Sequence, residues 1–346
     1  MSVLLTIMDP SDRSNFAVTA KHITGFVQVH VLREIERIEK KINLKLPTQV
    51  PQQRKSWFDL LRFAKHFAER FAAGRGWDAM GGLCSAGSFH SLIVRPDSGA
   101  WSWGREKLGR LGHGDPRSIY VRTLYRPKLI ESENFVAVST GDAFSLALTA
   151  NGRVKSWGSG NHGKLGHGDE VQVWRPKQIE ALKEEKVVAV SAGECHSLAL
   201  TAKGVIFTWG GLRNLHLPTQ IDLSVEIVAV SAGGQHSLAL ARDGTVWSWG
   251  YGHYGELGNG VGVDRRRSAQ PKRIVALEEE VVAVSAGGVH SLAVTASGTV
   301  YSWGRGDKGR LGHGDNADRW LPESIVGFRN PVRNPDNDRI LCKVVA

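Results

Sequence analysis

The amino-acid sequence predicts an all-β protein, a β-propeller built from four-stranded blades. Three observations favour this fold: a Trp-Gly pair that recurs five times, an earlier glycine at a constant distance before each pair, and turn-forming residues between short apolar runs. The repeated part carries no helical pattern between these runs. Units of four strands that repeat in this way fit propeller blades better than a sandwich or a solenoid.

The spacing of glycines divides each repeat into two halves. The glycine of every Trp-Gly pair stands 17 residues after an earlier glycine; the five couples are Gly87 and Gly104, Gly141 and Gly158, Gly193 and Gly210, Gly233 and Gly250, and Gly287 and Gly304. From a Trp-Gly glycine to the next earlier glycine, the distance is 37, 35, 23 and 37 residues. One half of the unit therefore has a fixed length, and the other half tolerates insertions.

The fixed half contains three predicted strands. In the last unit they cover residues 281–285, 290–296 and 299–303. The turns between the second and third strands carry residue pairs of which most tolerate positive φ, namely Asn151-Gly152, Lys203-Gly204, Asp243-Gly244 and Ser297-Gly298. Leucines alternate with small residues over 197–202, which predicts a strand that is buried on both faces.

The variable half supplies the fourth strand. It holds a Leu-Gly-x-Gly turn and then a proline that is expected to lead the strand. The leucines are Leu111, Leu165, Leu257 and Leu311, and the prolines are Pro127, Pro176, Pro218, Pro271 and Pro322. Because proline cannot donate to a sheet ladder, it favours an edge or a first strand position.

These motifs closely resemble those of the regulator of chromosome condensation repeat family. The signatures are VVAVSAGGVHSLA at 281–293 and YSWGRGDKGRLGHGD at 301–315. The resemblance covers about residues 82–346. It implies a propeller, usually of seven blades, whereas five units are evident in this chain.

The two ends of the chain differ from the repeats. Residues 1–80 are expected to form an extension with helices at about 28–44 and 56–73 and a candidate decayed blade at 10–30, and residues 81–346 to form the propeller. The last residues, from Lys343, begin a strand that stops before its Ser-Ala-Gly. This strand either completes the N-terminal blade, or the chain is a piece of a longer propeller.

Composition limits the class of protein. The net charge of +10 favours acidic partners such as nucleic acid or acidic proteins, but no dense basic tail is present. The three cysteines lack metal-ligand spacing and indicate reduced thiols in an intracellular protein, of the cytoplasm or the nucleus. No stretch approaches the roughly 18 apolar residues of a membrane span, so no membrane partner is expected.

Three segments imitate a dinucleotide-binding loop. The pattern G-x-G-x-x-G occurs at 158–163, 250–255 and 304–309. None of the three opens a helix whose N-terminus would hold a pyrophosphate, and the recurrence in three blades favours a structural turn. We therefore expect no cofactor and no small-molecule substrate.

Histidines at one position of the repeat raise the question of a metal ring. His90, His196, His236 and His290 share this position, and Phe144 replaces histidine in the second unit. The aromatic replacement favours packing and hydrogen bonding over metal binding. No Ser-His-Asp set stands out from the repeats, so the sequence predicts neither a metal site nor an enzyme.

The 11 tryptophans raise a further alternative, since an ultraviolet-B photoreceptor of this family senses light through clustered tryptophans. The resemblance would require Gly-Trp-Arg-His-Thr at the histidine positions. This chain has GSFHS at 87–91, GECHS at 193–197 and GGQHS at 233–237. The Trp-Gly tryptophans are therefore interpreted as blade core.

Function is expected in the loops, because blades are framework. The basic loop residues are the candidate partner-binding set: Arg117, Arg122, Arg126, Arg265, Arg266, Arg267, Arg329 and Arg333. Two functions follow from the resemblance. The first is an adaptor that binds a protein, such as a ubiquitin-pathway component. The second is a guanine-nucleotide exchange factor for a Ran-like small GTPase that also associates with chromatin.

Overall fold

The computed structural model describes residues 3–5, 18–20, 83–95, 99–114, 122–130, 135–211, 214–260 and 267–326. The chain separates into two compact units, Met1–Arg75 with Pro96–Ser98 and Gly76–Arg95 with Gly99–Ala346. In the first unit, β1 (Val3–Leu5) pairs antiparallel with β2 (Val18–Ala20). The helices expected at about 28–44 and 56–73, most of segment 10–30 and the strand expected from 343 lie outside the described residues.

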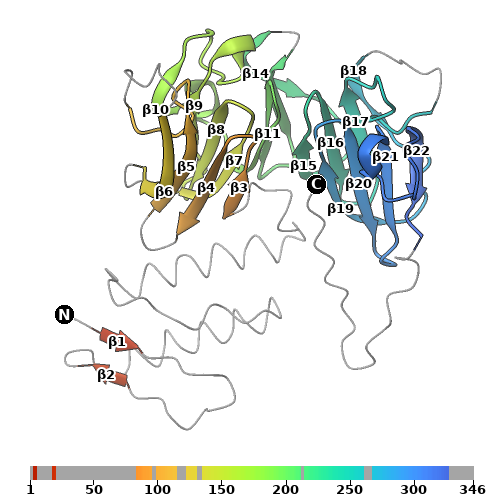
Figure 1. Ribbon diagram of the computed structural model, residues 1–346, viewed down its shortest axis with the longest axis horizontal. Coiled ribbons are helices and arrows are strands. Elements are labelled where there is room, and N and C mark those ends of the chain that lie inside the picture. Colours follow the sequence, from red (N-terminus) through yellow and green to blue (C-terminus); the bar gives the residue numbers. More distant parts are fainter. Residues whose placement is uncertain are drawn as a thin grey trace. The chain divides into compact units, whose positions relative to one another are not determined.

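The described residues of the second unit form five antiparallel sheets, each built from four consecutive strands (Figure 1). We call them blades 1 to 5 in chain order. Blade 1 is β3 (Cys84–Ala86), β4 (His90–Arg95), β5 (Gly99–Glu106) and β6 (Arg122–Leu129). Blade 2 is β7 (Phe135–Thr140), β8 (Phe144–Thr149), β9 (Val154–Gly158) and β10 (Val173–Gln178). Blade 3 is β11 (Val187–Ala192), β12 (His196–Thr201), β13 (Ile206–Gly210) and β14 (Leu215–Ile221).

The last two blades follow the same order. Blade 4 is β15 (Ile227–Ala232), β16 (His236–Ala241), β17 (Val246–Gly250) and β18 (Ser268–Arg273). Blade 5 is β19 (Val281–Ala286), β20 (His290–Thr295), β21 (Val300–Gly304) and β22 (Arg319–Ser324). Within the described residues, three short 3-10 helices, η2 (Asn161–Gly163), η3 (Glu180–Leu182) and η5 (Asp307–Gly309), lie in the connections. The predicted all-β fold of four-stranded propeller blades is confirmed.

The constant 17-residue interval of the repeat reflects the register between the second and third strands of each blade. The first residue of each second strand pairs with the glycine of the Trp-Gly pair, as in His90 with Gly104 and His196 with Gly210. A shift by one residue would turn every side chain of the strand to the other face. Since both faces of these strands are buried, for example along β12 and β16, a change in this length would disrupt the core.

Consecutive blades meet through their first two strands. From blade 2 onwards, each first strand contacts the first and second strands of the preceding blade, as β7 contacts β3 and β4. The fourth strand forms the opposite edge of each sheet. This arrangement is the one that propeller blades adopt around an axis.

The earlier glycine of the first four repeats lies where neighbouring blades approach closely. A Cβ atom on Gly141 would lie 2.4 Å from the Gly193 carbonyl oxygen, and one on Gly193 would lie 2.4 Å from the Gly233 oxygen. A Cβ atom on Gly87 would lie 2.5 Å from the Gly141 carbonyl oxygen, and one on Gly233 would lie 2.5 Å from the Gly287 oxygen. These glycines are therefore required by the lack of space for a side chain.

The hydrophobic core lies between the blades. The cluster between blades 2 and 3 joins Leu146 and Leu165 to Ala199 and Trp209, and similar clusters fill the other contacts. Trp157, Trp209 and Trp303 are fully buried. Trp249 is buried as well, so four of the five Trp-Gly tryptophans lie in the blade core as interpreted, whereas Trp103 is only partly buried.

The prolines stand inside the fourth strands and do not lead them. Pro176, for instance, is the fourth residue of β10, where the pairing with β9 is irregular between Val173 and Lys177. An edge strand with a local irregularity tolerates a residue without an N–H group. Within the described part of the chain, no helix has the length and apolar character that crossing a membrane requires.

Candidate functional site

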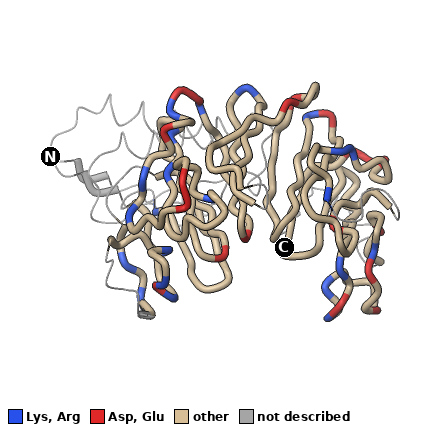
Figure 2. Tube along the Cα trace, turned by 90° about the horizontal axis from the view of Figure 1, so that it is seen from above, with Lys and Arg blue, Asp and Glu red and all other residues tan. Residues whose placement is uncertain are grey.

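The connections of each blade lie at two ends. Because neighbouring strands are antiparallel, the first-to-second and third-to-fourth connections share one end, which we call the insertion end. The second-to-third turns and the links between blades share the opposite end (Figure 1). Basic and acidic residues are interspersed along the connections of the described part (Figure 2).

A turn of sequence Gly-x-Leu-Gly-x-Gly occupies the insertion end of four blades, at residues 109–114, 163–168, 255–260 and 309–314. Its leucine is buried in every copy. A serine of the third strand donates a hydrogen bond to the leucine carbonyl, as Ser156 Oγ does to Leu165 over 2.7 Å. The His167 Nε2 lies 2.9 Å from the same hydroxyl. The turn is thereby fixed to its own blade.

The same turn also binds the next blade. The carbonyl oxygen of Arg110, just before the leucine, accepts hydrogen bonds from Ser145 Oγ and Trp157 Nε1, each over 2.9 Å. The Lys164 carbonyl accepts from Ser197 and Trp209, and the Glu256 carbonyl from Ser291 and Trp303, over 2.8–3.0 Å. One backbone oxygen therefore joins two donors at the contacts between blades 1 and 2, 2 and 3, and 4 and 5.

Three of the repeated histidines also join neighbouring blades, at the contacts between blades 1 and 2, 3 and 4, and 4 and 5. Nε2 of His90, His196 and His236 lies 2.9 Å from the serine hydroxyl of the following blade. Burial lowers the pKa of His90 to about 3, of His196 to about 4 and of His236 to about 3. The rings are therefore neutral, and in the first and last of these contacts Nε2 donates, because the serine hydroxyl donates to the turn. Phe144 is fully buried at the same position of blade 2.

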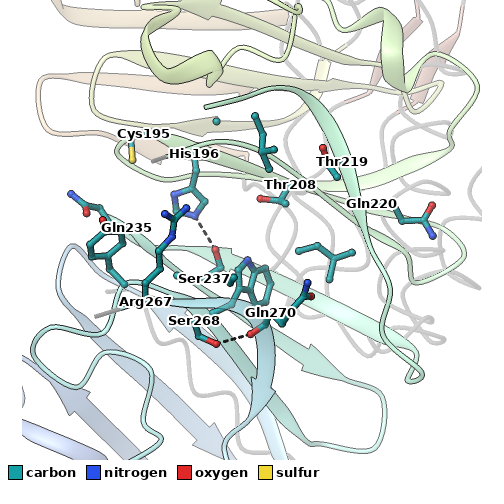
Figure 3. A pocket seen from close by; sticks show the side chains of 18 of the residues that line it. Cys195, His196, Thr208, Thr219, Gln220, Gln235, Ser237, Arg267, Ser268 and Gln270 are labelled. Carbon is teal, nitrogen blue, oxygen red and sulfur yellow. Dashed lines mark hydrogen bonds between the residues drawn. The ribbon is translucent and has the colours of Figure 1, made fainter. Parts of the chain in front are cut away.

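Blade 3 lacks the turn. Residues 211–214 connect β13 to β14, whereas residues 159–172 connect β9 to β10 in blade 2. A pocket of about 300 Å³ lies between blades 3 and 4 (Figure 3). His196 and Thr208 of blade 3 and Ser237, Trp249 and Arg267 of blade 4 line it.

Two donors of this pocket differ from their counterparts. Within the described residues, neither Ser237 Oγ nor Trp249 Nε1 donates to a backbone carbonyl, although Ser237 keeps its bond to His196. The Trp249 side chain retains 6% exposure, while Trp157, Trp209 and Trp303 have 0%. These two groups therefore line the pocket, whereas their counterparts in the other contacts are bonded to a turn carbonyl.

Exposed aromatic side chains stack with arginines at the insertion end. Phe89 is 49% exposed, and the guanidinium carbons of Arg105 and Arg110 lie 5.4 and 5.5 Å from its ring centroid. Arg305 lies 4.7 Å from the centroid of Tyr254. Such arginine–aromatic pairs combine a large contact area with a positive charge.

Of the basic residues expected to bind a partner, two have described side chains. Arg126 is exposed on β6 of blade 1, and Arg267 is exposed at the start of β18 in blade 4, where it lines the pocket. The structure does not bring these two together. The Arg122 backbone begins β6 and pairs with Glu106. Five further candidates, Arg117, Arg265, Arg266, Arg329 and Arg333, lie outside the described residues.

Sequence reasoning did not select Phe89, Tyr254 or the donors of the pocket. The signal for the pocket was the interval of 23 residues between Gly210 and Gly233, which is shorter than the others. Nothing comparable marks Phe89. The described residues contain no group of three or more His, Cys, Asp or Glu side chains placed to hold a metal ion.

Comparison with known proteins identifies the family of the repeats. The model described as "Regulator of chromosome condensation (RCC1) repeat" matches residues 97–148, 151–200, 243–294 and 297–334. The chain belongs to the regulator of chromosome condensation (RCC1) repeat family. A second model of the same description matches residues 135–164, 187–214, 227–256 and 281–310.

The relatives are proteins of several kinds. The chain is 33% identical over 250 residues to the human E3 ubiquitin-protein ligase HERC2, covering 69% of this chain and 4% of the ligase. It is 32% identical over 254 residues to the ultraviolet-B receptor UVR8 of Arabidopsis thaliana, covering 70% of this chain and 55% of the receptor. It is 33% identical over 275 residues to the RCC2 homolog of Danio rerio, covering 73% and 46%. The chain thus spans little more than half, or less, of these relatives.

Solved structures share the fold. Human WBSCR16 has a TM-score of 0.64 and 27% identity, over 70% of this chain and 66% of that one. Prp20p of Saccharomyces cerevisiae, whose binding to Gsp1p and histones was described with its structure, has a TM-score of 0.59 and 24% identity, over 68% and 61%. The family and the fold of the blades are established by these matches.

Proposed function

We propose that this chain is a protein-interaction module, a propeller adaptor that binds a protein partner through its insertion end. The observation that carries the proposal is Phe89, a large apolar side chain that is about half exposed between two arginines. Aromatic residues and arginine are the types that dominate binding energy at protein interfaces. The surface around Phe89 has this composition.

This surface is also held in place before any partner arrives. Arg110 Nε donates to the Lys107 carbonyl over 2.9 Å, and one terminal nitrogen donates to the Asp142 carbonyl over 3.0 Å. The Arg110 side chain therefore loses little conformational freedom on binding, which lowers the entropic cost of association. Its fixed guanidinium supports one side of the Phe89 ring.

The partner is expected to be a protein with acidic groups near the contact. Net charge of +10 and the arginines at Phe89 favour such a partner. The kinship with HERC2 makes a ubiquitin-pathway protein one partner class to examine. We include Arg267 and its neighbours Arg265 and Arg266 in the contact surface as a further proposal.

Affinity capture with the full chain tests the proposal. Phe89→Ala is expected to reduce recovery of a stable protein partner at least tenfold, because hot-spot truncations cost about 2 kcal/mol or more. Val275→Ser is the matched control, since Val275 is 74% exposed and follows β18 at the opposite end. Equal losses in the two variants would contradict the proposal.

Two further measurements sharpen the assignment. Replacing Arg265, Arg266 and Arg267 by serine is expected to weaken capture without unfolding the chain, and unchanged capture would remove this group from the contact surface. A nucleotide-release assay with a panel of small GTPases runs beside the capture. Release well above the intrinsic rate would replace the adaptor proposal with the exchange-factor function.

A further inference from the structure

The occupied contacts between blades use two backbone groups of the turn. The first is the carbonyl before the leucine, which accepts from the serine and the tryptophan of the next blade. The second is the amide four residues later, which donates to the fourth strand of that blade: Gly114 to Trp174, Gly168 to His216 and Gly260 to Trp320, over 2.9–3.0 Å. Three contacts thus share one pattern of donors and acceptors.

Strand register identifies the equivalent groups between blades 3 and 4. The Trp-Gly glycine pairs with the first residue of the fourth strand in each of these blades, as Gly158 with Val173 and Gly250 with Ser268. Ala269 therefore corresponds to Trp174, His216 and Trp320. Among the described residues, no turn amide donates to the Ala269 carbonyl.

The third-strand serine has a counterpart as well. Thr208 stands where Ser102, Ser156, Ser248 and Ser302 bind the leucine carbonyl of their own turns. Thr208 lines the pocket, and its hydroxyl has no such carbonyl within the described part of blade 3. The pocket therefore presents donors at Thr208, Ser237 and Trp249 and an acceptor at Ala269.

The shape of the pocket agrees with this pattern. Ala269 has a small side chain where blades 2, 3 and 5 carry tryptophan or histidine, which adds space beside the missing turn. Ile221 and Trp249 contribute apolar side chains to the lining of the pocket. A volume of about 300 Å³ lies at the lower end of ligand sites and suits a short peptide segment.

We infer that the pocket between blades 3 and 4 binds a turn from a partner protein with the backbone pattern of Gly-x-Leu-Gly-x-Gly. The carbonyl before the guest leucine accepts from Ser237 and Trp249, the leucine carbonyl accepts from Thr208, and a later amide donates to Ala269. This inference rests on the proposed function, because it names the chemistry of a partner segment. Arg267 and Asp222 both line the pocket, and their charges are opposite. The guest is therefore selected by its backbone groups and its leucine and not by its net charge.

A peptide with the turn of blade 2 is the probe. Its sequence is that of residues 159–169, SGNHGKLGHGD, closed into a ring so that the turn is populated. Binding to the full chain is followed by calorimetry. The peptide with Leu165→Ser is expected to bind roughly tenfold or more weakly, because burial of a leucine side chain contributes about 1.5–3 kcal/mol.

Protein variants locate the bound peptide. Ser237→Ala and Trp249→Phe each remove one donor and are expected to weaken binding about three- to tenfold. Ser197→Ala and Trp209→Phe are the matched controls, because they lie at a contact that its own turn fills. These two are expected to leave the peptide affinity unchanged. Circular dichroism and thermal unfolding confirm that each variant is folded.

A graft supplies a second test that removes no side chain of the pocket. Residues 211–214 are replaced by the blade 2 segment 159–172, which brings the turn into blade 3. This variant is expected to lose peptide binding while remaining folded. Retained binding would overturn the inference, as would equal affinities for the two peptides.

The outcomes separate this inference from the proposed function. Phe89 belongs to blade 1 and is not part of the pocket. If the peptide does not bind and Phe89→Ala still loses the partner, the pocket inference fails and the adaptor proposal stands. If the peptide binds as expected and Phe89→Ala has no effect on capture, the contact at Phe89 fails and the pocket remains.

Discussion

His90 and Ser145 are 55 positions apart and share a hydrogen bond of 2.9 Å between the imidazole Nε2 and the hydroxyl Oγ. The same hydroxyl donates to the Arg110 carbonyl, which also accepts from the Trp157 indole. One serine therefore connects the second strand and the turn of blade 1 to the core of blade 2. His236 and Ser291 form the same connection between blades 4 and 5.

Replacing Ser145 by alanine is expected to lower the free energy of unfolding by about 1–3 kcal/mol, because the change leaves the buried His90 nitrogen without its acceptor and the Arg110 carbonyl without one donor. Urea unfolding measures the difference. Ser237→Ala is the comparison, since the Ser237 hydroxyl meets no turn carbonyl in the described part of the contact. A cost for Ser237→Ala as large as that for Ser145→Ala would contradict the role assigned to the carbonyl.

Gly141→Ala is expected to destabilise the chain by about 1–3 kcal/mol, because a methyl group there overpacks the contact between blades. The added Cβ would lie 2.2 Å from the Phe144 ring and 2.4 Å from the Gly193 carbonyl. Gly288→Ala is the matched control, since its Cβ would come no closer than 3.9 Å to Glu194. Thermal unfolding compares the two variants, and similar midpoints would show that the close approach at Gly141 carries no cost.

Much of the fold followed from the spacing of residues. The 17-residue interval is a property of a single hairpin, so local sequence determines it and predicts the second and third strands. The glycines of the tight turns behave as expected: Gly152, Gly204, Gly244 and Gly298 have φ between 78° and 85°. The family resemblance predicted that the units are propeller blades.

The candidate site was less accessible to sequence reasoning. Ser145 is an ordinary small residue in a strand pattern, and its partners His90 and Arg110 belong to another blade. Contacts of this kind depend on how blades stack, which periodicity does not encode. The short interval after Gly210 did mark blade 3 as different, but the pocket-lining donors Ser237 and Trp249 were recognisable only by comparison with the occupied contacts.

The buried histidines predict a dependence of stability on pH. Their pKa values in the folded chain, about 3 for His90 and His236 and about 4 for His196, lie below the ordinary value of 6.5 because burial disfavours the charged ring. Between pH 6.5 and about 4, the unfolded chain therefore binds protons that the folded chain does not. The free energy of unfolding is expected to have its highest value, as far as these histidines determine it, above pH 6.5 and to fall as the pH drops through this range.

His236→Phe tests this dependence, since Phe144 shows that the position accepts an aromatic ring. The variant removes one proton-binding group of the unfolded chain, so the decline in stability between pH 6.5 and 5 is expected to be shallower, by at most about 1.4 kcal/mol per pH unit. Urea unfolding at several pH values gives both slopes. Parallel slopes for the variant and the natural chain would show that His236 does not contribute.

A pair of tryptophan variants isolates the hydrogen bond that the missing turn would have supplied. Trp209 Nε1 donates to the Lys164 carbonyl over 2.9 Å, whereas within the described residues Trp249 Nε1 meets no carbonyl. Both side chains are buried between blades, so Trp→Phe removes a similar apolar area at each site. Trp209→Phe is therefore expected to cost about 0.5–1.5 kcal/mol more than Trp249→Phe, the net contribution of one hydrogen bond. Urea unfolding of both variants provides the measurement. The same two substitutions are then made in the grafted chain, which carries the blade 2 turn in blade 3. There the two costs are expected to become equal, because Trp249 Nε1 then has a turn carbonyl as its acceptor. A difference that persists in the grafted chain would assign the cost to packing around Trp209 and not to the bond.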